Sequence, residues 1–328
     1  MKTLALAVLC CAPAVAASAS DLAPLETRVA AIVARSRSTV GVGLRDLASG
    51  ETVLVRGRDH FPMFSVYKLP IALRVLQLVD EGALRLADAV PIAPGDLRPG
   101  LSTAVTARLR DGHGSLTIAE LVKAAVAQSD NTASDVLLRL AGGPEAVTAS
   151  VRALGIEGLR VDRPEIQMAA DTYGVTLPAS WGPDELPKLL AAPPSQRRAA
   201  IERYVADPRD SATPEAALAL LARVARRDAL SPASADFLLR TLEQTTTGPG
   251  RIRGGLPKGT VVANKTGSGP TALGYTAATN DVGLVTLPSG RQIAVAAFVS
   301  ASSADEASRD RTIAEIARAA FDHWSRER

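Results

Sequence analysis

The sequence is poor in the side chains that most often bind metals or act as catalytic bases. Only two cysteines, Cys10 and Cys11, and three histidines, His60, His113 and His323, occur among the 328 residues. No two of these histidines share a metal-ligand spacing, so we expect no zinc site. The residues for a catalytic serine–histidine or cysteine–histidine pair are therefore also scarce. A catalytic nucleophile in this chain would therefore need lysine, glutamate or aspartate as its base.

The chain also lacks a large excess of charge of either sign. It carries 37 lysines and arginines against 34 aspartates and glutamates, a formal net charge of +3. The basic residues are scattered, and we therefore predict no nucleic-acid partner. With 47% hydrophobic and 22% charged residues the composition is that of a globular protein. The length is sufficient for a sizeable core without disulfides, and favours about two domains.

The N-terminus has the layout of a secretory signal peptide. Lys2 precedes an apolar run over residues 4–11, and small residues at alternate positions follow at 14–16 and 17–19. Such a segment is too short to span a membrane. We predict that residues 1–20 are a signal peptide and that the protein is periplasmic or secreted. The alternative is a buried N-terminal helix. Both cysteines fall within the signal segment, so the mature chain would contain no thiol.

Hydrophobic periodicity predicts strands near both ends of the chain and helices between them. A helical pattern surrounds Val29, and a final helix shows Ile313 and Trp324 on one face. Strands are predicted at 40–44, 52–56, 260–265, 281–287 and 292–299, and helical runs at 66–79, 118–127, 132–141 and 214–225. No convincing strand is found between 65 and 242. We predict an α/β domain formed by residues 21–60 and 243–328, with an all-helical domain, residues 61–242, inserted.

The region from about 171 to 209 does not fit this helical pattern. It contains six of the 21 prolines of the chain, at positions 178, 183, 187, 193, 194 and 208. We interpret it as a surface excursion; the alternative is a functional loop near a site. Ser195 is predicted to cap a short helix that extends to Val205.

Three short motifs suggest a nucleophilic serine. Ser65 precedes Lys68 by three positions at a predicted helix start, which places both side chains on one helical face. A serine hydroxyl is a weak nucleophile until a base takes its proton, and a lysine amine can do so. The motif alone is weak, because a capping serine followed by a surface lysine has the same spacing. Two further motifs strengthen it: Ser129-Asp130-Asn131 follows a helix end, and Lys265-Thr266-Gly267-Ser268-Gly269 closes a predicted strand.

These three motifs together are the set found in class A β-lactamases and penicillin-binding proteins. The sequence resembles a class A serine β-lactamase over nearly the whole mature chain. Residues 165–168, 260–269 and 276–284 are similar to the extended-spectrum, PER-like branch. The resemblance implies an α/β plus all-α architecture of the β-lactamase and penicillin-binding-protein type. In that architecture an antiparallel sheet is flanked by the terminal helices, and a helical domain is inserted.

The resemblance also implies roles for individual residues. Ser65 would be the nucleophile, Lys68 its proton partner, and Ser129 the donor of a proton to the departing nitrogen. Asp130 would be structural. The backbone N–H groups of Ser65 and Ser268 would form an oxyanion hole. Substrate binding is implied for Asn131, Lys265, Thr266, Gly267, Ser268 and Arg251. A solvated surface arginine is the alternative for Arg251. No metal and no cofactor are implied.

Glu165 matches the glutamate that activates water for deacylation in this family. Two features depart from the family pattern. The family has asparagine or histidine four positions after this glutamate, whereas this chain has Ala169, whose methyl group cannot hydrogen-bond a water molecule. Asp210, which matches the far end of the family's Ω-loop, comes 45 positions after Glu165, whereas compact Ω-loops have about 6–16 residues. We therefore expect an Ω-loop region at 163–213 with an insertion at about 171–209.

The implied function is that of a serine β-lactamase that hydrolyses β-lactams through a Ser65 acyl-enzyme, with cephalosporin activity. The expected binding partner is the β-lactam alone. We expect no membrane span, and we expect the chain to be a monomer. Two alternatives stay open. One is a DD-peptidase or penicillin-binding enzyme with slow deacylation, and the other is a non-catalytic β-lactam-binding sensor.

Overall fold

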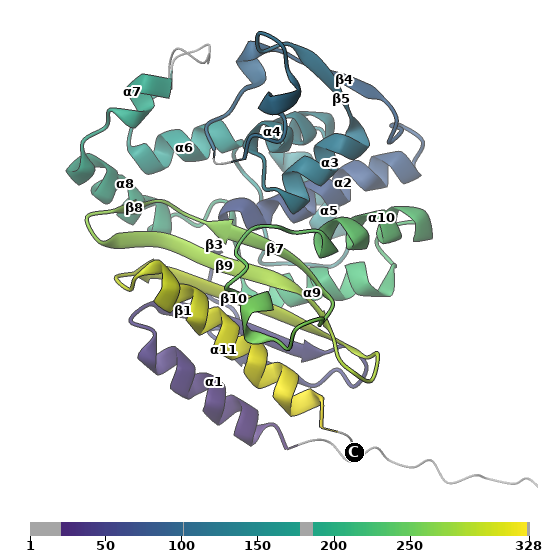
Figure 1. Cartoon of the computed structure of the whole chain (residues 1–328), viewed down its shortest axis with the longest axis vertical. Coiled ribbons are helices and arrows are strands. Elements are labelled where there is room, and N and C mark those ends of the chain that lie inside the picture. Colours follow the sequence, from purple (N-terminus) through teal and green to yellow (C-terminus); the bar gives the residue numbers. More distant parts are fainter. Residues whose placement is uncertain (1–20, 101, 178–185, 327–328) are drawn as a thin grey trace, which may run out of the picture.

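An antiparallel sheet forms the centre of the molecule (Figure 1). The computed structural model describes residues 21–100, 102–177 and 186–326. The predicted signal peptide lies outside these residues, as do positions 178–185 of the expected insertion. The strand order is β2-β1-β10-β9-β7, and β8 pairs with β9. The bounds are β1 Thr39–Asp46, β2 Thr52–Val55, β7 Val262–Ser268, β8 Thr271–Ala272, β9 Tyr275–Thr286 and β10 Gln292–Ser302.

The strands predicted near both termini are present, and the largest change of boundary is at the start of β9. Strand β9 begins at Tyr275, six residues before the predicted start. Its first half contains Thr276, Thr279 and Asn280, which are buried although polar. A search for apolar alternation misses such a segment, because hydrogen bonds and not hydrophobicity justify the burial of these side chains. This polar half of β9 pairs with the end of β7, where Thr266 lies opposite Asp281.

Helices cover both faces of the sheet. The terminal helices α1 (Ala23–Arg35) and α11 (Glu306–Trp324) pack together on one face (Figure 1). On α11, the predicted face with Ile313 and Trp324 is buried against the sheet, and Asp305 caps the helix by accepting a hydrogen bond from the Ser308 amide at 2.7 Å. Helix α9 (Pro214–Arg226) packs on the opposite face, against β1 and β10.

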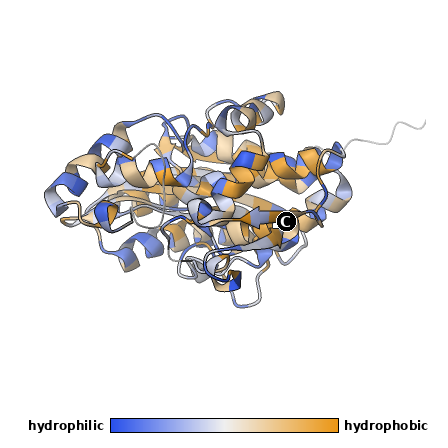
Figure 2. Ribbon diagram, turned by 90° about the horizontal axis from the view of Figure 1, so that it is seen from above, coloured by the Kyte–Doolittle hydropathy of each residue, from blue (hydrophilic) through white to orange (hydrophobic). Residues whose placement is uncertain are grey.

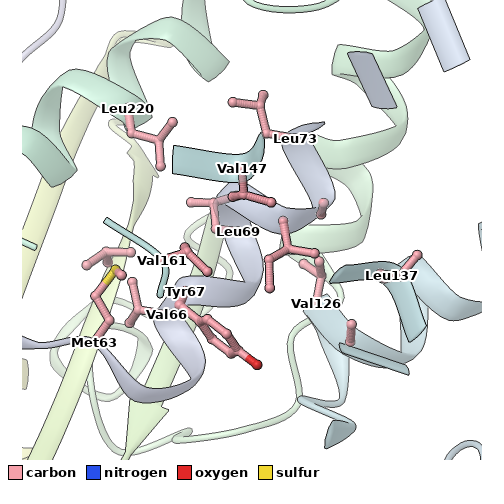
Figure 3. Close-up of a cluster of buried hydrophobic side chains, with 14 of the residues drawn as sticks. Met63, Val66, Tyr67, Leu69, Leu73, Val126, Leu137, Val147, Val161 and Leu220 are labelled. Atoms are coloured by element: carbon pink, nitrogen blue, oxygen red, sulfur yellow. The ribbon is translucent and has the colours of Figure 1, made fainter. Parts of the chain in front are cut away.

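Several further helices form a second layer around a buried central helix, α2. Leu69 and Leu73 of α2 point into an apolar cluster that also receives Val126, Leu137 and Val147 (Figure 3). Figure 2 shows hydrophobic residues concentrated in the interior of the molecule and hydrophilic residues at its periphery. The helices of this layer are α2 Lys68–Asp80, α3 Ile118–Ala127, α4 Asn131–Leu140, α5 Pro144–Ala153 and α10 Pro232–Glu243. No helix within the described ranges is long and apolar enough to cross a membrane.

The expectation that residues 65–242 contain no strand is wrong. Strands β4 (Ala89–Ile92) and β5 (Gly114–Thr117) pair with each other, and β6 (Ser211–Ala212) pairs with β3 (Phe61–Pro62). These strands are two to four residues long, and Pro91 interrupts the apolar pattern of β4. Such strands are defined by their pairing partners, which the local sequence does not reveal. The β3–β6 pair places the end of the Ω-loop beside the segment that leads to Ser65.

The proline-rich region is largely helical, and it is not a surface excursion throughout. It comprises the end of α6 (Glu165–Tyr173), then α7 (Leu186–Leu190) and α8 (Pro194–Ala206). Ala200, Ile201 and Tyr204 of α8 are buried. Ser195 does not cap this helix, which begins one residue earlier, after Pro193. A proline at the first helical position has a suitable φ angle already, so prolines that suggested a loop instead start a helix.

Candidate active site

Ser65 lies at the junction between the sheet and the helical layer. It is part of a 3₁₀ turn, Phe64–Tyr67, that continues directly into α2 at Lys68. The prediction of a serine at a helix start is therefore confirmed. Phe64, immediately before it, has a φ of +46°, which is unfavourable for a residue with a Cβ atom. The Ser65 side chain is half-buried. No described residue makes a hydrogen bond with its hydroxyl group, so the oxygen is available to another molecule.

Lys68 connects several of the predicted site residues. Its side chain is fully buried, and Nζ donates hydrogen bonds to Asn131 Oδ1 at 2.6 Å and to the Ser129 carbonyl oxygen at 2.8 Å. Glu165 Oε1 lies 2.9 Å from the same nitrogen. No residue in the described ranges directs a hydrogen bond onto this Oε1 atom, so the contact is an ion pair without a well-directed hydrogen bond. A carboxylate and an amine in such contact can share a proton.

The Ser129 turn is held by Asp130. Ser129 has a φ of +58°, and Asp130 caps α4 by accepting a hydrogen bond from the Ala133 amide at 2.9 Å. The second oxygen of Asp130 accepts hydrogen bonds from Ser102 Oγ and from the Val105 amide. These bonds give Asp130 the structural role that the resemblance implies.

Strand β7 provides the third motif. Lys265 Nζ donates to Ser129 Oγ at 3.0 Å and to the Thr266 carbonyl oxygen at 2.9 Å. Burial, and then the neighbouring charge of Lys68, lower the pKa of Lys265 well below its ordinary value. Gly267 allows β7 to approach the Ser65 segment, since a Cβ atom there would lie 2.3 Å from the Met63 carbonyl oxygen. Asn280 Nδ2 also donates to that oxygen, at 3.1 Å.

Arg251 is buried behind β7, and the surface alternative for this residue is wrong. It is 4% exposed. Its Nη2 donates to Ser268 Oγ at 2.7 Å and its Nη1 to the Gly267 carbonyl oxygen at 3.1 Å. Its Nε donates to Asp310 Oδ1 at 2.9 Å. The guanidinium thus adds positive charge next to Ser268, close to Lys265.

Glu165 is fixed from two sides. Its backbone N–H, at the start of α6, donates to Asp135 Oδ1 at 2.7 Å. Burial raises the pKa of the Asp135 carboxyl to about 6, although the Arg98 guanidinium lies 2.5 Å away. On the other side, Arg163 Nε contacts Asp210 Oδ2 at 2.5 Å. Asp210, at the far end of the Ω-loop region, is therefore tied to Arg163, two positions before Glu165.

A cavity of about 400 Å³ opens beside Glu165. Its wall includes Asn131 and Ala169. The other lining residues are mostly apolar or aromatic: Phe64, Pro99, Gly100, Met168, Thr172, Tyr173, Leu190 and Pro270. Position 169 therefore faces the space beside Glu165 with a methyl group only.

Sequence reasoning missed several residues that shape this site. Asp135 follows Asn131 by four positions on the same helix, and this spacing could have indicated a shared face. Phe64 and Tyr204, whose ring centroids are 5.1 Å apart, are 140 positions apart in the chain. No local signal connects them.

Known proteins of similar sequence and structure identify the family of this chain. The sequence profile of the β-lactamase enzyme family matches residues 24–324. Two relatives from Pseudomonas aeruginosa are similar to this chain. β-lactamase VEB-1 is 30% identical, and the match covers 92% of this chain and 90% of VEB-1. Extended-spectrum β-lactamase PER-1 is 31% identical, and the match covers 90% of this chain and 86% of PER-1. The chain belongs to the β-lactamase enzyme family.

Solved structures of β-lactamases share the fold. TLA-3 extended-spectrum β-lactamase has a TM-score of 0.78 at 31% identity, with 93% of this chain and all of that chain covered. A β-lactamase from Chitinophaga pinensis has a TM-score of 0.77 at 36% identity, with 91% and 98% covered. The predicted resemblance to class A enzymes of the PER-like branch and the predicted fold are both confirmed. As a class A β-lactamase, the protein is a hydrolase.

Proposed function

We propose that this β-lactamase opens the β-lactam amide bond through an acyl-enzyme on Ser65. The observation that supports this most strongly is the convergence of the three motifs. Lys68 contacts Ser129, Asn131 and Glu165, and Lys265 contacts the Ser129 hydroxyl from the sheet side. The site therefore places two lysines, a glutamate and two serines in one region between the layers.

Acylation begins with attack of Ser65 Oγ on the β-lactam carbonyl carbon. The Lys68–Glu165 pair takes the hydroxyl proton, and the backbone N–H groups of Ser65 and Ser268 stabilise the oxyanion. An oxyanion donor of this kind is worth about 10²–10³ in rate. The carbon–nitrogen bond then breaks, and Ser129 Oγ passes its proton to the nitrogen. The 3.0 Å contact with the Lys265 ammonium favours loss of that proton. Ser129 Oγ regains a proton from the Lys68–Glu165 pair, whose Lys68 Nζ lies 3.5 Å away, so the pair is ready for the next step.

Deacylation uses water. Glu165 removes a proton from a water molecule as its oxygen attacks the ester carbonyl carbon, and the ester bond to Ser65 Oγ breaks as that oxygen regains a proton. General-base assistance contributes about 10²–10⁴ in rate. Ala169 adds no second contact to this water. Turnover therefore depends on Glu165, which separates the proposed enzyme from a penicillin-binding protein that retains its acyl group.

The substrate is an anionic β-lactam, and we propose that cephalosporins are included. Lys265, Thr266 and Ser268, with Arg251 behind them, provide positive charge and hydroxyl groups for the carboxylate. Asn131 provides an amide for the acylamino carbonyl. The extended-spectrum names of two relatives support cephalosporin activity. We also propose that residues 1–20 direct export of the protein to the periplasm or medium. The protein would be a monomer that binds no nucleic acid. Its α/β domain and its helical domain would meet near residues 60 and 243.

Steady-state hydrolysis of a chromogenic cephalosporin by the protein without residues 1–20 tests this proposal. We expect saturable turnover that Ser65→Ala abolishes. A DD-peptidase would instead hydrolyse a D-alanyl-D-alanine peptide and turn over the cephalosporin only stoichiometrically. A non-catalytic sensor would show no turnover and would keep its affinity in Ser65→Ala.

A further inference from the structure

The helix α8, which belongs to the insertion, reaches the segment that carries the nucleophile. Tyr204 of α8 is 2% exposed, and its ring centroid lies 5.1 Å from that of Phe64. Phe64 is the residue immediately before Ser65. The inserted region therefore contacts the acylating segment itself and not only the loop that presents Glu165.

Phe64 lies between the two segments that present the oxyanion donors. Its φ of +46° is a conformation that must be held by its surroundings. Its ring also packs on the backbone of Gly269, where a Cβ atom would come within 2.7 Å of the ring carbons. Phe64 adjoins Ser65 and Gly269 adjoins Ser268, so this ring contact connects the two segments that carry the proposed oxyanion donors.

Tyr204 is itself held in place by charged groups. The Arg163 guanidinium lies 4.6 Å from the Tyr204 ring centroid, and Arg163 is paired with Asp210. The Tyr204 hydroxyl has no hydrogen-bond partner among the described residues. The contacts of the aromatic ring, not of the hydroxyl, therefore define what this side chain does.

Two side chains near the start of α8 connect this helix to neighbouring elements. Gln196 Nε2 donates to the Gly174 carbonyl oxygen at the end of α6, at 2.7 Å. Arg198 stacks on Tyr275 at 4.0 Å from the ring centroid and donates to the Leu273 carbonyl oxygen at 3.4 Å. Helix α8 thus bridges the Glu165 helix to the β8–β9 hairpin, which follows Gly269 directly.

We propose that Tyr204 is a positioning residue that braces Phe64 against Gly269 and thereby sets the geometry of the oxyanion hole. The inference rests on the proposed acyl-enzyme function. Because the same two amides serve acylation and deacylation, loss of the brace slows both steps by a similar factor. A displacement of about 1 Å in an active site can cost about 10² in rate.

The test is a comparison of single-turnover acylation and deacylation rates with one cephalosporin. In Tyr204→Ala we expect both rates to fall at least about tenfold. In Tyr204→Phe both rates stay within about twofold, because the hydroxyl is unpaired. Ile201→Ala is the matched control, since it removes a fully buried side chain from the same helix and keeps the ring contact between Tyr204 and Phe64. It lowers the melting temperature but leaves both rates within about twofold.

The inference is overturned if folded Tyr204→Ala keeps its rates, if only one of the two steps slows, or if Ile201→Ala slows both steps equally. Should Tyr204→Ala not fold, Tyr204→Leu takes its place with the same expectations, since it retains apolar volume without the ring. A mass increase on Ser65 in the wild-type protein is measured alongside. Its absence would refute the proposed function, whereas its presence together with unchanged Tyr204 variants would refute only the positioning role.

Discussion

In the proposed deacylation step, side chains on the cavity wall beside Glu165 hold the attacking water. Ala169 faces the cavity beside Glu165. We predict that Ala169→Asn accelerates deacylation severalfold and leaves acylation unchanged, because a carboxamide can hydrogen-bond the attacking water. Ala169→Val, which adds bulk without a polar atom, is the control and should give no gain. Stopped-flow measurement of the two steps checks this. Equal rates for the wild type and Ala169→Asn would show that the water needs no second contact.

The buried Lys265 connects activity to pH. Its pKa is lowered by burial and by Lys68, so it loses its charge at a lower pH than an ordinary lysine. In the proposed binding mode the substrate carboxylate needs that charge, so kcat/KM should fall on the alkaline side as Lys265 deprotonates. In Lys265→Arg the alkaline limb should move to higher pH, since arginine stays protonated. Lys258→Arg, at an exposed position, should leave it in place. A limb that does not move in Lys265→Arg would assign the titration to another group.

The sequence indicates these chemical groups more readily than their partners. Ser65, Lys68, Ser129 and Lys265 could be predicted because each belongs to a short motif with fixed spacing. The contact between Lys68 and Glu165 spans 97 positions. It depends on how α6 docks on α2 and α4, which local spacing does not encode.

At the scale of elements, a buried ion pair connects the two ends of the Ω-loop region. Arg163 and Asp210 are 4% and 0% exposed, and Asp210 also accepts the backbone amides of Asp162 and Arg163. We predict that Arg163→Ala lowers the free energy of unfolding by about 3–5 kcal/mol, because it leaves a buried carboxylate unpaired. Urea denaturation measures this.

The exposed pair Arg35–Glu315 provides the control for that prediction. Its side chains are 64% and 42% exposed, so Arg35→Ala should cost no more than about 1 kcal/mol. Similar losses for Arg163→Ala and Arg35→Ala would contradict the structural role of the buried pair.

Long periodic elements could be predicted from the sequence, and short or proline-rich ones could not. Helix α3 begins and ends at the predicted residues, because Thr117 and Glu120 form a capping box and a clear apolar face follows. The strands β4, β5 and β6 are too short for a periodic pattern. Helix α8 starts at a Pro-Pro pair and has an arginine-rich surface, so only its tertiary contacts show that Tyr204 and Ile201 are buried.

For the whole molecule, two buried acids make stability depend on pH. Burial raises the pKa values of Asp135 and Asp281 to about 6. Below about pH 3 both groups are protonated in the folded and unfolded states. As the pH rises from about 4 through 6 the unfolded chain releases these protons first, so their contribution to the free energy of unfolding falls. Above this range the contribution is lost.

Asp135→Asn removes one of these titrations. The free energy of unfolding of this variant, relative to wild type, should rise between about pH 4 and pH 6 by about 3 kcal/mol, and then level off. Denaturation of both proteins at several pH values measures this difference. A difference that is constant over this range, or one that falls with pH, would contradict the burial of an ionisable Asp135.

The arrangement of layers could be predicted because strands at both ends of the chain and helices between them permit few topologies. The packing of the insertion on the sheet could not be predicted, because it depends on contacts among Phe64, Tyr204 and Gly269, which are far apart in the sequence. The added chain length thus becomes part of the site through contacts that no single segment reveals.

Rapid-quench mass spectrometry with one cephalosporin tests acyl-enzyme turnover at Ser65 most directly. Wild-type protein should show a transient mass increase on the peptide containing Ser65, decaying at the rate of steady-state turnover. In Glu165→Gln the same adduct should form and persist about 10²–10⁴ times longer. Absence of an adduct on Ser65 during wild-type hydrolysis, or an adduct in Glu165→Gln that decays as fast as in wild type, would contradict the mechanism.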